Sequence, residues 1–400
     1  MSTASRGYLA VALAAGAVFA LGLGVRQAQP LFISAINSHT GAGYAAISLA
    51  FAVGQLMWGI AQPAAGAVAD RWGPRPVMIA GALLVAAATA ATPLAQTSFA
   101  LIVLIGILAA TGAGALGPAL LMSAANRWIP EAKRNVASGI INAGGSFGQF
   151  TLIPFAQLLI GIAGWQPALV ILGATGLLAV PLVLYLTRGS AVAQTPTQAG
   201  TLRGAVREAA GDRSYLLLNI GFFTCGFHVA FIATHLPGVV ASCMLPPNVG
   251  AWSLAIIGLF NIAGSLWVGK MIGEWRMKLT LAGIYAARAA IILVFFYSPK
   301  TELTFFLFAA GIGFTYLSTV PPTVGLVAKL HGQRYLATLF GIVMLSHQVG
   351  GFLGAWLGGK AFEASGNYDW MWWADAALCL MAAAVHLPIR EARRPAPAAA

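Results

Sequence analysis

The sequence contains few charged residues. Asp, Glu, Lys and Arg make up 8% of its 400 residues, whereas hydrophobic residues make up 59%. The mean hydropathy is +0.82. So few charges cannot cover the surfaces of the two or three soluble domains that this length would otherwise suggest. The composition therefore excludes an ordinary water-soluble protein and predicts a chain that lies in lipid.

Cysteines and nucleotide-binding motifs are scarce as well. The three cysteines, Cys225, Cys243 and Cys379, have no metal-site spacing, and an odd number provides no disulfide framework. No G-x-x-x-x-G-K-[ST] stretch occurs, so ATP is not expected to drive the function. We expect no cofactor, no metal and no enzymatic activity.

Long apolar runs dominate what is present. Helices are the expected spanning element, because a helix satisfies its own backbone where water is absent, and each needs roughly 20 residues. The first run follows Arg6, as in a secretory signal peptide, but the further spans favour an uncleaved helix. The sequence predicts an all-α membrane protein with twelve transmembrane helices over residues 8–36, 44–66, 76–95, 98–125, 135–162, 166–187, 214–240, 248–272, 278–297, 302–328, 335–360 and 369–388.

The basic residues lie mostly on one side of the predicted topology. With a cytoplasmic N-terminus, 18 of the 22 Lys and Arg residues fall in cytoplasmic segments. Lys300 and Lys360 lie outside, and Arg26 and Arg288 remain within spans. This asymmetry follows the positive-inside rule. The net charge of +12 therefore indicates topology, with both termini in the cytoplasm, rather than a nucleic-acid partner.

Two halves of the sequence repeat one another. Residues 66–75 (GAVADRWGPR) have a degenerate copy at 269–278 (GKMIGEWRMK), an offset of 203, and residues 139–148 match 341–350 at an offset of 202. Parallel halves with a site at their interface are one architecture of membrane transporters. The predicted domains are two six-helix bundles and a cytoplasmic linker between them, residues 1–187, 214–400 and 188–213.

Residues 66–75 resemble the loop signature of the major facilitator superfamily. The resemblance rests on Gly66, Asp70, Arg71, Gly73 and Arg75, and the span count and the repeat extend it over essentially the whole chain. It implies two pseudo-symmetric six-helix bundles and a conformational latch at this loop. Asp70 would cap a neighbouring helix N-terminus or pair with a basic side chain. The alternative is a charged loop that only fixes the topology.

Three further segments are similar to bacterial members of the monocarboxylate porter and oxalate/formate antiporter branches. They are residues 24–32 (GVRQAQPLF), 226–237 (GFHVAFIATHLP) and 345–354 (LSHQVGGFLG). Those branches often place a carboxylate-binding arginine in the eighth span. This sequence has Asn261 there instead, so the resemblance leaves the substrate open.

Arg26 is the main candidate for substrate binding. A charge at the centre of a transmembrane helix costs about 3 kcal/mol on insertion scales, so a functional role is the default interpretation. The 202-residue offset pairs Arg26 with His228, which predicts two partners facing each other across the cavity. A guanidinium can hold a carboxylate by two hydrogen bonds. Alternatively, Arg26 caps backbone carbonyls or extends toward the outer surface.

Three histidines are candidates for a coupling proton, because histidine titrates near neutral pH. His228 and His235 lie two helical turns apart on one face, and His347 lies in the eleventh span. For each, a neutral, hydrogen-bonded histidine is an equally good interpretation. The other candidates are polar residues on helices that the resemblance places at the cavity, although such residues also join helices: Gln29, Asn142, Gln149, Asn261, Tyr316, Thr319 and Gln348, with Trp58 and Gln62 as weaker ones.

Acidic residues are nearly absent from the predicted spans. Of the ten, only Asp375 lies inside one, about six residues from the outer end of the twelfth span. No carboxylate is therefore evident for a cationic drug, and a net positive cavity is expected. Arg288 lies about 15 Å into the ninth span. We consider for it both a structural pairing, with a carbonyl or Tyr285, and a substrate role.

These features predict a monomeric secondary transporter of the bacterial inner membrane. It would move a small organic anion, above all a monocarboxylate, by alternating access, with Arg26 binding the carboxylate and with proton symport. The alternative is proton-coupled efflux of neutral or amphiphilic compounds, because residues 139–148 loosely resemble the proton antiporters of the superfamily. Close helix packing would explain these glycines equally well. A non-transporting receptor is a third hypothesis, which the short loops disfavour.

Overall fold

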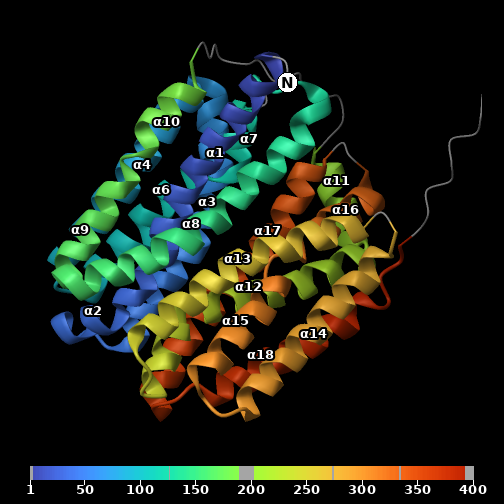
Figure 1. The fold of residues 1–400 in the computed structure, drawn as a ribbon. Helices are drawn as coiled ribbons and strands as arrows, with labels where there is room; N and C mark the ends of the chain where they lie inside the picture. Colours follow the sequence, from blue (N-terminus) through green and yellow to red (C-terminus); the bar gives the residue numbers. More distant parts are fainter. Residues whose placement is uncertain (1–2, 126, 189–201, 273, 333–334, 392–400) are drawn as a thin grey trace, which may run out of the picture.

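The computed structural model describes residues 3–125, 127–188, 202–272, 274–332 and 335–391, which form a bundle of long helices and no strand (Figure 1). Eleven helical segments of this part are long and apolar enough to cross a membrane. The twelfth, α18 (Asp369–His386), has 18 residues, which include two aspartates and a histidine. The prediction of an all-α, twelve-helix membrane protein is confirmed.

The first half of the chain forms six spans, some of them broken into consecutive helices. Two of the breaks lie at prolines, Pro30 and Pro118. In chain order the elements are α1 (Thr3–Ala28), η1 (Gln29–Phe32), α2 (Ile33–Thr40), α3 (Tyr44–Trp72), α4 (Pro74–Ala91), η2 (Thr92–Leu94), α5 (Ser98–Leu101), the π-helix η3 (Ile102–Ala109), α6 (Ala110–Ala115), α7 (Pro118–Ala125), η4 (Glu131–Lys133), α8 (Arg134–Ala163), α9 (Trp165–Gly176) and α10 (Ala179–Leu186).

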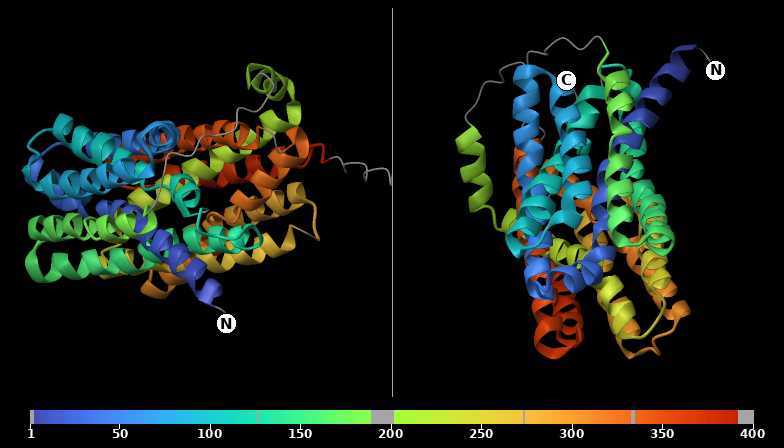
Figure 2. Two further views of the ribbon diagram at one scale, coloured as in Figure 1. Left: turned by 90° about the horizontal axis from the view of Figure 1, so that it is seen from above. Right: turned by 90° about the vertical axis from the view of Figure 1, so that its left-hand side faces the viewer.

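The second half begins with a short surface helix and continues with six further spans. Its elements are α11 (Leu202–Gly211), α12 (Arg213–Ser242), α13 (Pro247–Met271), α14 (Met277–Tyr297), α15 (Glu302–Thr315), α16 (Val320–His331), α17 (Leu336–Ser365) and α18. Seen from above in Figure 2, the helices of the two halves form two neighbouring groups.

A single residue separates the second span from the third. Gly73 has φ +84°, a region that favours glycine, and ends α3. Pro74 begins α4, where its missing N–H costs no helical hydrogen bond. The expected loop from Gly66 onward is therefore wrong, because α3 continues to Trp72 and takes up most of that segment.

Equivalent helices pack in the same way in the two halves. In the first half, a Cβ on Gly24 of α1 would lie 2.7 Å from the carbonyl oxygen of Gly148 on α8. In the second half, a Cβ on Gly226 of α12 would lie even closer to the backbone carbonyl oxygen of His347 on α17. Gly24 and Gly226 are 226 − 24 = 202 residues apart, which is the sequence offset. The pseudo-symmetric repeat is thus visible as matching close contacts between helices.

The two halves contact each other at one end of the bundle, which we call the outer end and which carries residues 41–48. Here Tyr44 on α3 packs against Phe362 on α17, with ring centroids 4.9 Å apart. The backbone N–H of Ala45 also donates to the Glu363 carboxylate at 3.1 Å. The outer end is therefore closed.

Halfway along the bundle, polar side chains join the halves. Gln149 Nε2 of α8 donates to the carbonyl of Leu254 on α13, and Asn261 Nδ2 donates to Ser146 Oγ, both at 2.9 Å. One turn nearer the opposite, inner end, Asn142 lies on the same face of α8 as Ser146 and is exposed. The halves therefore separate toward the inner end.

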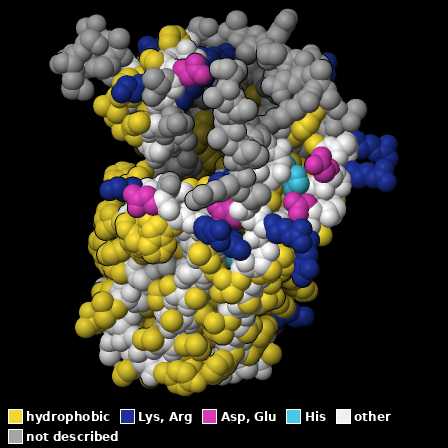
Figure 3. Space-filling model, turned by 90° about the vertical axis from the view of Figure 1, so that its right-hand side faces the viewer, with side chains coloured by type: hydrophobic (Ala, Val, Ile, Leu, Met, Phe, Trp, Pro, Cys, Tyr) yellow, Lys and Arg dark blue, Asp and Glu magenta, His cyan; other side chains and the backbone are white. Residues whose placement is uncertain are grey.

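Charged side chains gather toward the inner end, in the upper half of Figure 3. The lower half of the same face is mostly hydrophobic. Near this end, α11 buries Ala209 and exposes Arg203 and Arg207, as an amphipathic surface helix does. Residues 189–201 of the predicted linker lie outside the described residues. The domain limits at 187 and 214 therefore remain predictions.

Candidate functional site

Arg26 lies in the middle of the first span, two residues before α1 gives way to η1. Its Nη2 donates to Gln55 Oε1 at 2.8 Å, and its Cζ lies 5.5 Å from the centroid of the Trp58 ring. Gln55 and Trp58 are three residues apart on α3, so they share one face of that helix. Two neutral groups thus hold the half-buried guanidinium between α1 and α3.

A small cavity between the two halves adjoins this guanidinium. It offers about 20 Å³ to the centres of water molecules, room for about one water. Arg26 is the only charged residue among those that the structure shows around it, so its surroundings are positive and rich in hydrogen-bond donors. The lining residues are Arg26, Gln27, Gln29, Pro30, Phe51, Gly54, Gln55, Ile105, Ala233 and Thr234.

Some residues of this cavity were expected from the sequence and others were missed. Gln29 is buried at its edge and donates to Thr89 Oγ1 at 2.9 Å. Gln55 was overlooked, although helical spacing puts it on the same face as Trp58 and Gln62, which were ranked as weaker candidates. Thr234 was also overlooked, and it carries no comparable sequence signal.

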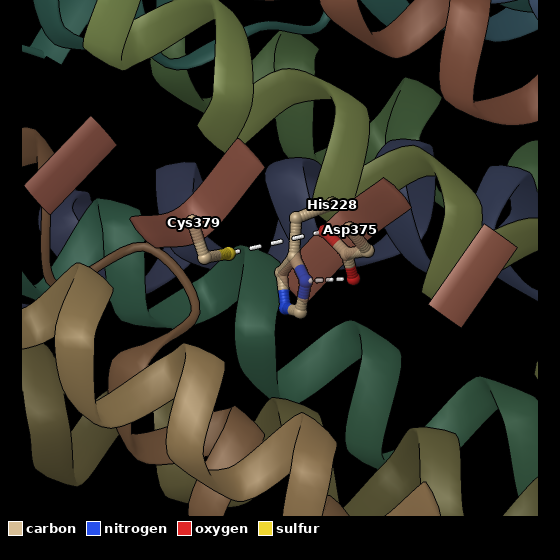
Figure 4. Close-up of side chains that lie close together, drawn as sticks. All are labelled: His228, Asp375 and Cys379. Carbon is tan, nitrogen blue, oxygen red and sulfur yellow. Dashed lines mark hydrogen bonds and ion pairs between the residues drawn. The ribbon is translucent and has the colours of Figure 1, made fainter. Parts of the chain in front are cut away.

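His228 does not line this cavity. Its side chain is fully buried, and Nδ1 lies 2.7 Å from Oδ2 of Asp375 on α18, whose other oxygen is 3.9 Å from Cys379 Sγ (Figure 4). The expectation that His228 faces Arg26 across the cavity is therefore wrong in this conformation. A buried carboxylate needs a hydrogen-bond partner, and His228 provides it for Asp375.

The three side chains in Figure 4 are not arranged to hold a metal ion. Their ligand atoms lie within 4.8 Å of one another. However, two atoms bound to one tetrahedral zinc ion lie about 3.3 Å apart. The 2.7 Å between His228 Nδ1 and Asp375 Oδ2 is instead a hydrogen-bond length.

Arg288 lies in the second half, away from the cavity. Its Nη2 donates to the backbone oxygens of Thr315 and Tyr316, and its Cζ lies 5.2 Å from the centroid of the Tyr285 ring. These carbonyls are available because the tenth span breaks between α15 and α16. The contacts therefore match the structural pairing considered for Arg288 rather than a substrate role.

Tyr316 lies between the cavity at Arg26 and the buried residues His228, Asp375 and Arg288. Its hydroxyl donates to the carbonyl of Val229 at 2.9 Å, and its ring centroid lies 6.4 Å from that of His228. It also lies close enough to Arg26 for an electrostatic interaction. Tyr316 is thus a shared neighbour of Arg26 and His228.

Several of the predicted cavity residues make contacts between helices instead. Gln149 and Asn261 join the halves, and Gln348 lies against Gly59 of α3. The structure places the remaining ones as follows: Asn142 donates to Ser138 O, Thr319 contacts Cys225 Sγ, His235 bonds to Ala355 O, and the His347 ring lies 5.0 Å from that of Phe222.

The predicted latch is only partly described. Arg71 and Arg75 are exposed at the inner end and Gly66 is half-buried; Arg71 lies 5.4 Å from the centroid of the Trp72 ring. The side chain of Asp70 lies outside the described residues. The latch therefore remains a prediction.

Comparison with known proteins agrees with this architecture. The chain is 24% identical to the uncharacterized MFS-type transporter YcxA of Bacillus subtilis, covering 88% of both chains. It is also 24% identical to monocarboxylate transporter 13 of Rattus norvegicus, over 81% of this chain and 75% of that one. The oxalate:formate antiporter of Oxalobacter formigenes is 24% identical, over 87% and 82%.

Solved structures show the same fold. A bacterial homologue of the human lysosomal transporter Spinster, in an inward-facing and unoccupied conformation, superposes with a TM-score of 0.68 at 17% identity, covering 97% of this chain and 95% of that one. The profile of the Major Facilitator Superfamily matches residues 12–355. The chain therefore belongs to the Major Facilitator Superfamily, a family of membrane transporters rather than enzymes.

Proposed function

We propose that this protein carries a small organic anion, above all a monocarboxylate, across the bacterial inner membrane by alternating access. The observation that carries the proposal is the half-buried guanidinium of Arg26, held by the neutral side chains of Gln55 and Trp58 at a cavity between the halves. A fixed positive charge with no carboxylate partner in this cavity favours an anion. The names of the monocarboxylate and oxalate:formate relatives support the same class of substrate.

The substrate carboxylate would take the place of the Gln55 amide oxygen on Arg26. The guanidinium presents several donors in one plane, so it can bind both carboxylate oxygens. The cavity has room for about one water molecule, which is too little for an organic anion. Binding therefore requires Gln55 to turn away or the halves to move apart.

The open inner end faces the cytoplasm in this proposal, with both chain termini on that side. The excess of basic residues in the segments assigned to the cytoplasm supports this orientation. The protein would work as a monomer in lipid and would bind no nucleic acid. Rocking of the two halves would then expose Arg26 to either side in turn.

Efflux of neutral or amphiphilic compounds is the alternative function. The sequence argument for it was the set of glycines in α8, within residues 139–148. Gly144 and Gly148 lie against the backbone of Gly16 and Ala20 on α1, where a Cβ would overlap backbone atoms. Close helix packing therefore accounts for these two glycines. They give efflux no specific support.

The test is transport by purified protein in liposomes, with radiolabelled formate, acetate, lactate, oxalate and sulfoacetate. We expect Arg26→Gln to lower the affinity of the preferred anion about a hundredfold, because the anion would lose its counter-charge in a poorly solvated site. Arg26→Lys should restore it only in part, since an ammonium lacks the planar fork. The matched control is Arg203→Gln, which removes an exposed charge from α11.

Two results would contradict this function. One is a well-folded Arg26→Gln protein, checked by size exclusion, that binds the anion as the wild type does. The other is a wild-type protein that transports none of the five anions while it transports a neutral compound.

A further inference from the structure

The buried pair of His228 and Asp375 has one free proton-binding position. Nδ1 of His228 donates to the Asp375 carboxylate, the acceptor that fixes this tautomer, so Nε2 carries the lone pair. Nε2 is buried and has no hydrogen-bond partner among the described residues. A proton can therefore add to Nε2 while the bond between Nδ1 and Asp375 remains.

The groups around the pair balance its charge only when the histidine is neutral. Arg288 on α14 carries a fixed positive charge close to His228, and Asp375 is the carboxylate that offsets it. The remaining titratable groups around this pair are thiols, phenols and imidazoles, with no second carboxylate among the described residues: Cys225, Tyr285, Tyr316, His347, Cys379 and His386. Protonation of His228 thus adds one uncompensated positive charge.

Arg26 carries the other uncompensated charge of the membrane interior, on the opposite side of Tyr316. Two like charges repel each other in a low-dielectric interior, so the field of Arg26 opposes a second positive charge on His228. An anion bound to Arg26 removes this field. The anion and the proton therefore favour each other's binding, and the coupling is reciprocal.

We propose that His228, held by Asp375, takes up the proton that travels with the anion on Arg26. The inference rests on the proposed function and names the proton site within it. A proton adds to the Nε2 lone pair on one side of the membrane and leaves from it on the other, and no covalent bond to carbon forms or breaks. The net charge of Arg26, Arg288, Asp375 and His228 is +1 in the empty carrier and stays +1 when a monoanion and a proton are both bound, so the symport is electroneutral.

The experiment compares two modes of transport of radiolabelled lactate, formate and acetate in proteoliposomes. Exchange is measured as counterflow at equal pH, which needs no net proton movement. Symport is measured as accumulation driven by an inward proton gradient. We expect His228→Gln and Asp375→Asn to retain counterflow and to lose gradient-driven accumulation, down to the level of liposomes without protein.

His235→Gln is the matched control. His235 is also a buried histidine of α12, but it bonds to the backbone oxygen of Ala355 and has no carboxylate partner. We expect this variant to accumulate the anion as the wild type does. Asp375→Asn keeps the proposal testable if His228→Gln does not fold, because asparagine has nearly the same shape as aspartate.

Each outcome decides between the two proposals. Accumulation by folded His228→Gln and Asp375→Asn, or loss of both modes in them, would overturn the proton site. Wild-type counterflow without any response to the proton gradient would overturn it as well, while leaving anion transport in place. A wild type that performs neither mode with any of these anions would overturn the proposed function instead.

Discussion

The carboxylate of Glu363, near the end of α17, accepts a hydrogen bond from the backbone N–H of Ala45 in the first turn of α3. The two residues belong to different halves of the molecule. N–H groups of a first helical turn have no partner within their helix, and the helix dipole attracts a negative charge there. Glu363 therefore caps α3 from the other half and holds the outer end closed.

Removal of the Glu363 charge should favour opening of the outer end. Glu363→Gln keeps an acceptor but loses the charge, which we expect to cost the closed state about 1 kcal/mol, or about fivefold in population. The measurement is labelling of Ser48→Cys by an impermeant maleimide added from outside, in a protein whose native cysteines are alanine. Ser48 is buried beside Gly359 of α17. Equal labelling rates in Glu363→Gln and in the exposed-site control Glu302→Gln would contradict the role of Glu363 in holding the outer end closed.

The indole of Trp58 should contribute to anion binding through Arg26. Trp58→Leu removes the ring that lies 5.5 Å from the guanidinium carbon, and we expect a loss of about 1 kcal/mol in affinity. Trp58→Phe should lose less, because it retains an aromatic face. Calorimetric titration of the preferred anion measures the effect. The matched control is Trp72→Leu, which removes a similar contact with Arg71 at the exposed end of α3 and should leave the affinity unchanged.

The contact of α1 with α8 should not tolerate a larger residue at Gly148. A Cβ there would overlap the backbone of Ala20, so Gly148→Ala should destabilise the protein by about 1 to 3 kcal/mol. Gly139→Ala, on the same helix, meets nothing within 4 Å and should be neutral or slightly stabilising, since alanine is the better helix former. Thermal midpoints in detergent compare the two. Equal midpoints would show that α1 and α8 are less closely packed than described.

The carboxylate of Glu391 should give the protein an acid-sensitive contact. Burial alone would raise its pKa, but hydrogen bonds from Lys329 Nζ and from the backbone N–H groups of Lys278 and Met277 hold the pKa below its usual value. The stabilisation is therefore present above the ordinary pKa of about 4.3 and is lost as the pH falls through the lowered value.

Thermal midpoints at several pH values test this contact. Glu391→Gln should lower the midpoint at neutral pH, and the difference from wild type should shrink below about pH 4. Glu208→Gln, at an exposed position of α11, is the control. A constant difference at all pH values would mean that the charge of Glu391 does not stabilise the fold.

The spans could be predicted because each apolar run is long enough to cross a membrane, and the repeat of residues 66–75 led to the family. The orientation of side chains could not be predicted in the same way. A helix with one polar face shows which side is buried. Helix α12 is buried on nearly all sides, from Thr224 to His228 without a break, so its sequence gives no sign of which way His228 points. The partner Asp375 is 147 residues away on a different helix.

The position of Arg26 was easier to predict, because a charge within an apolar run stands out. Its partners on α3 were harder, since glutamine and tryptophan occur in many membrane helices for other reasons. Helix ends were also uncertain. The last turns of α3 are as polar as a loop, and only the positive φ of Gly73 shows where that helix stops.

Gly73 also limits how the first half can move. Consecutive Cα atoms are about 3.8 Å apart, so a one-residue connection leaves no slack between the inner ends of α3 and α4. Helix α3 borders the second half at Gly59 and Ala45, whereas α4 packs on α9 within the first half. A displacement of α3 must therefore drag α4 and the helices behind it. A movement of α3 at the interface between the halves is therefore passed on to α4 on the far side of the first half. Helix α3 cannot move alone.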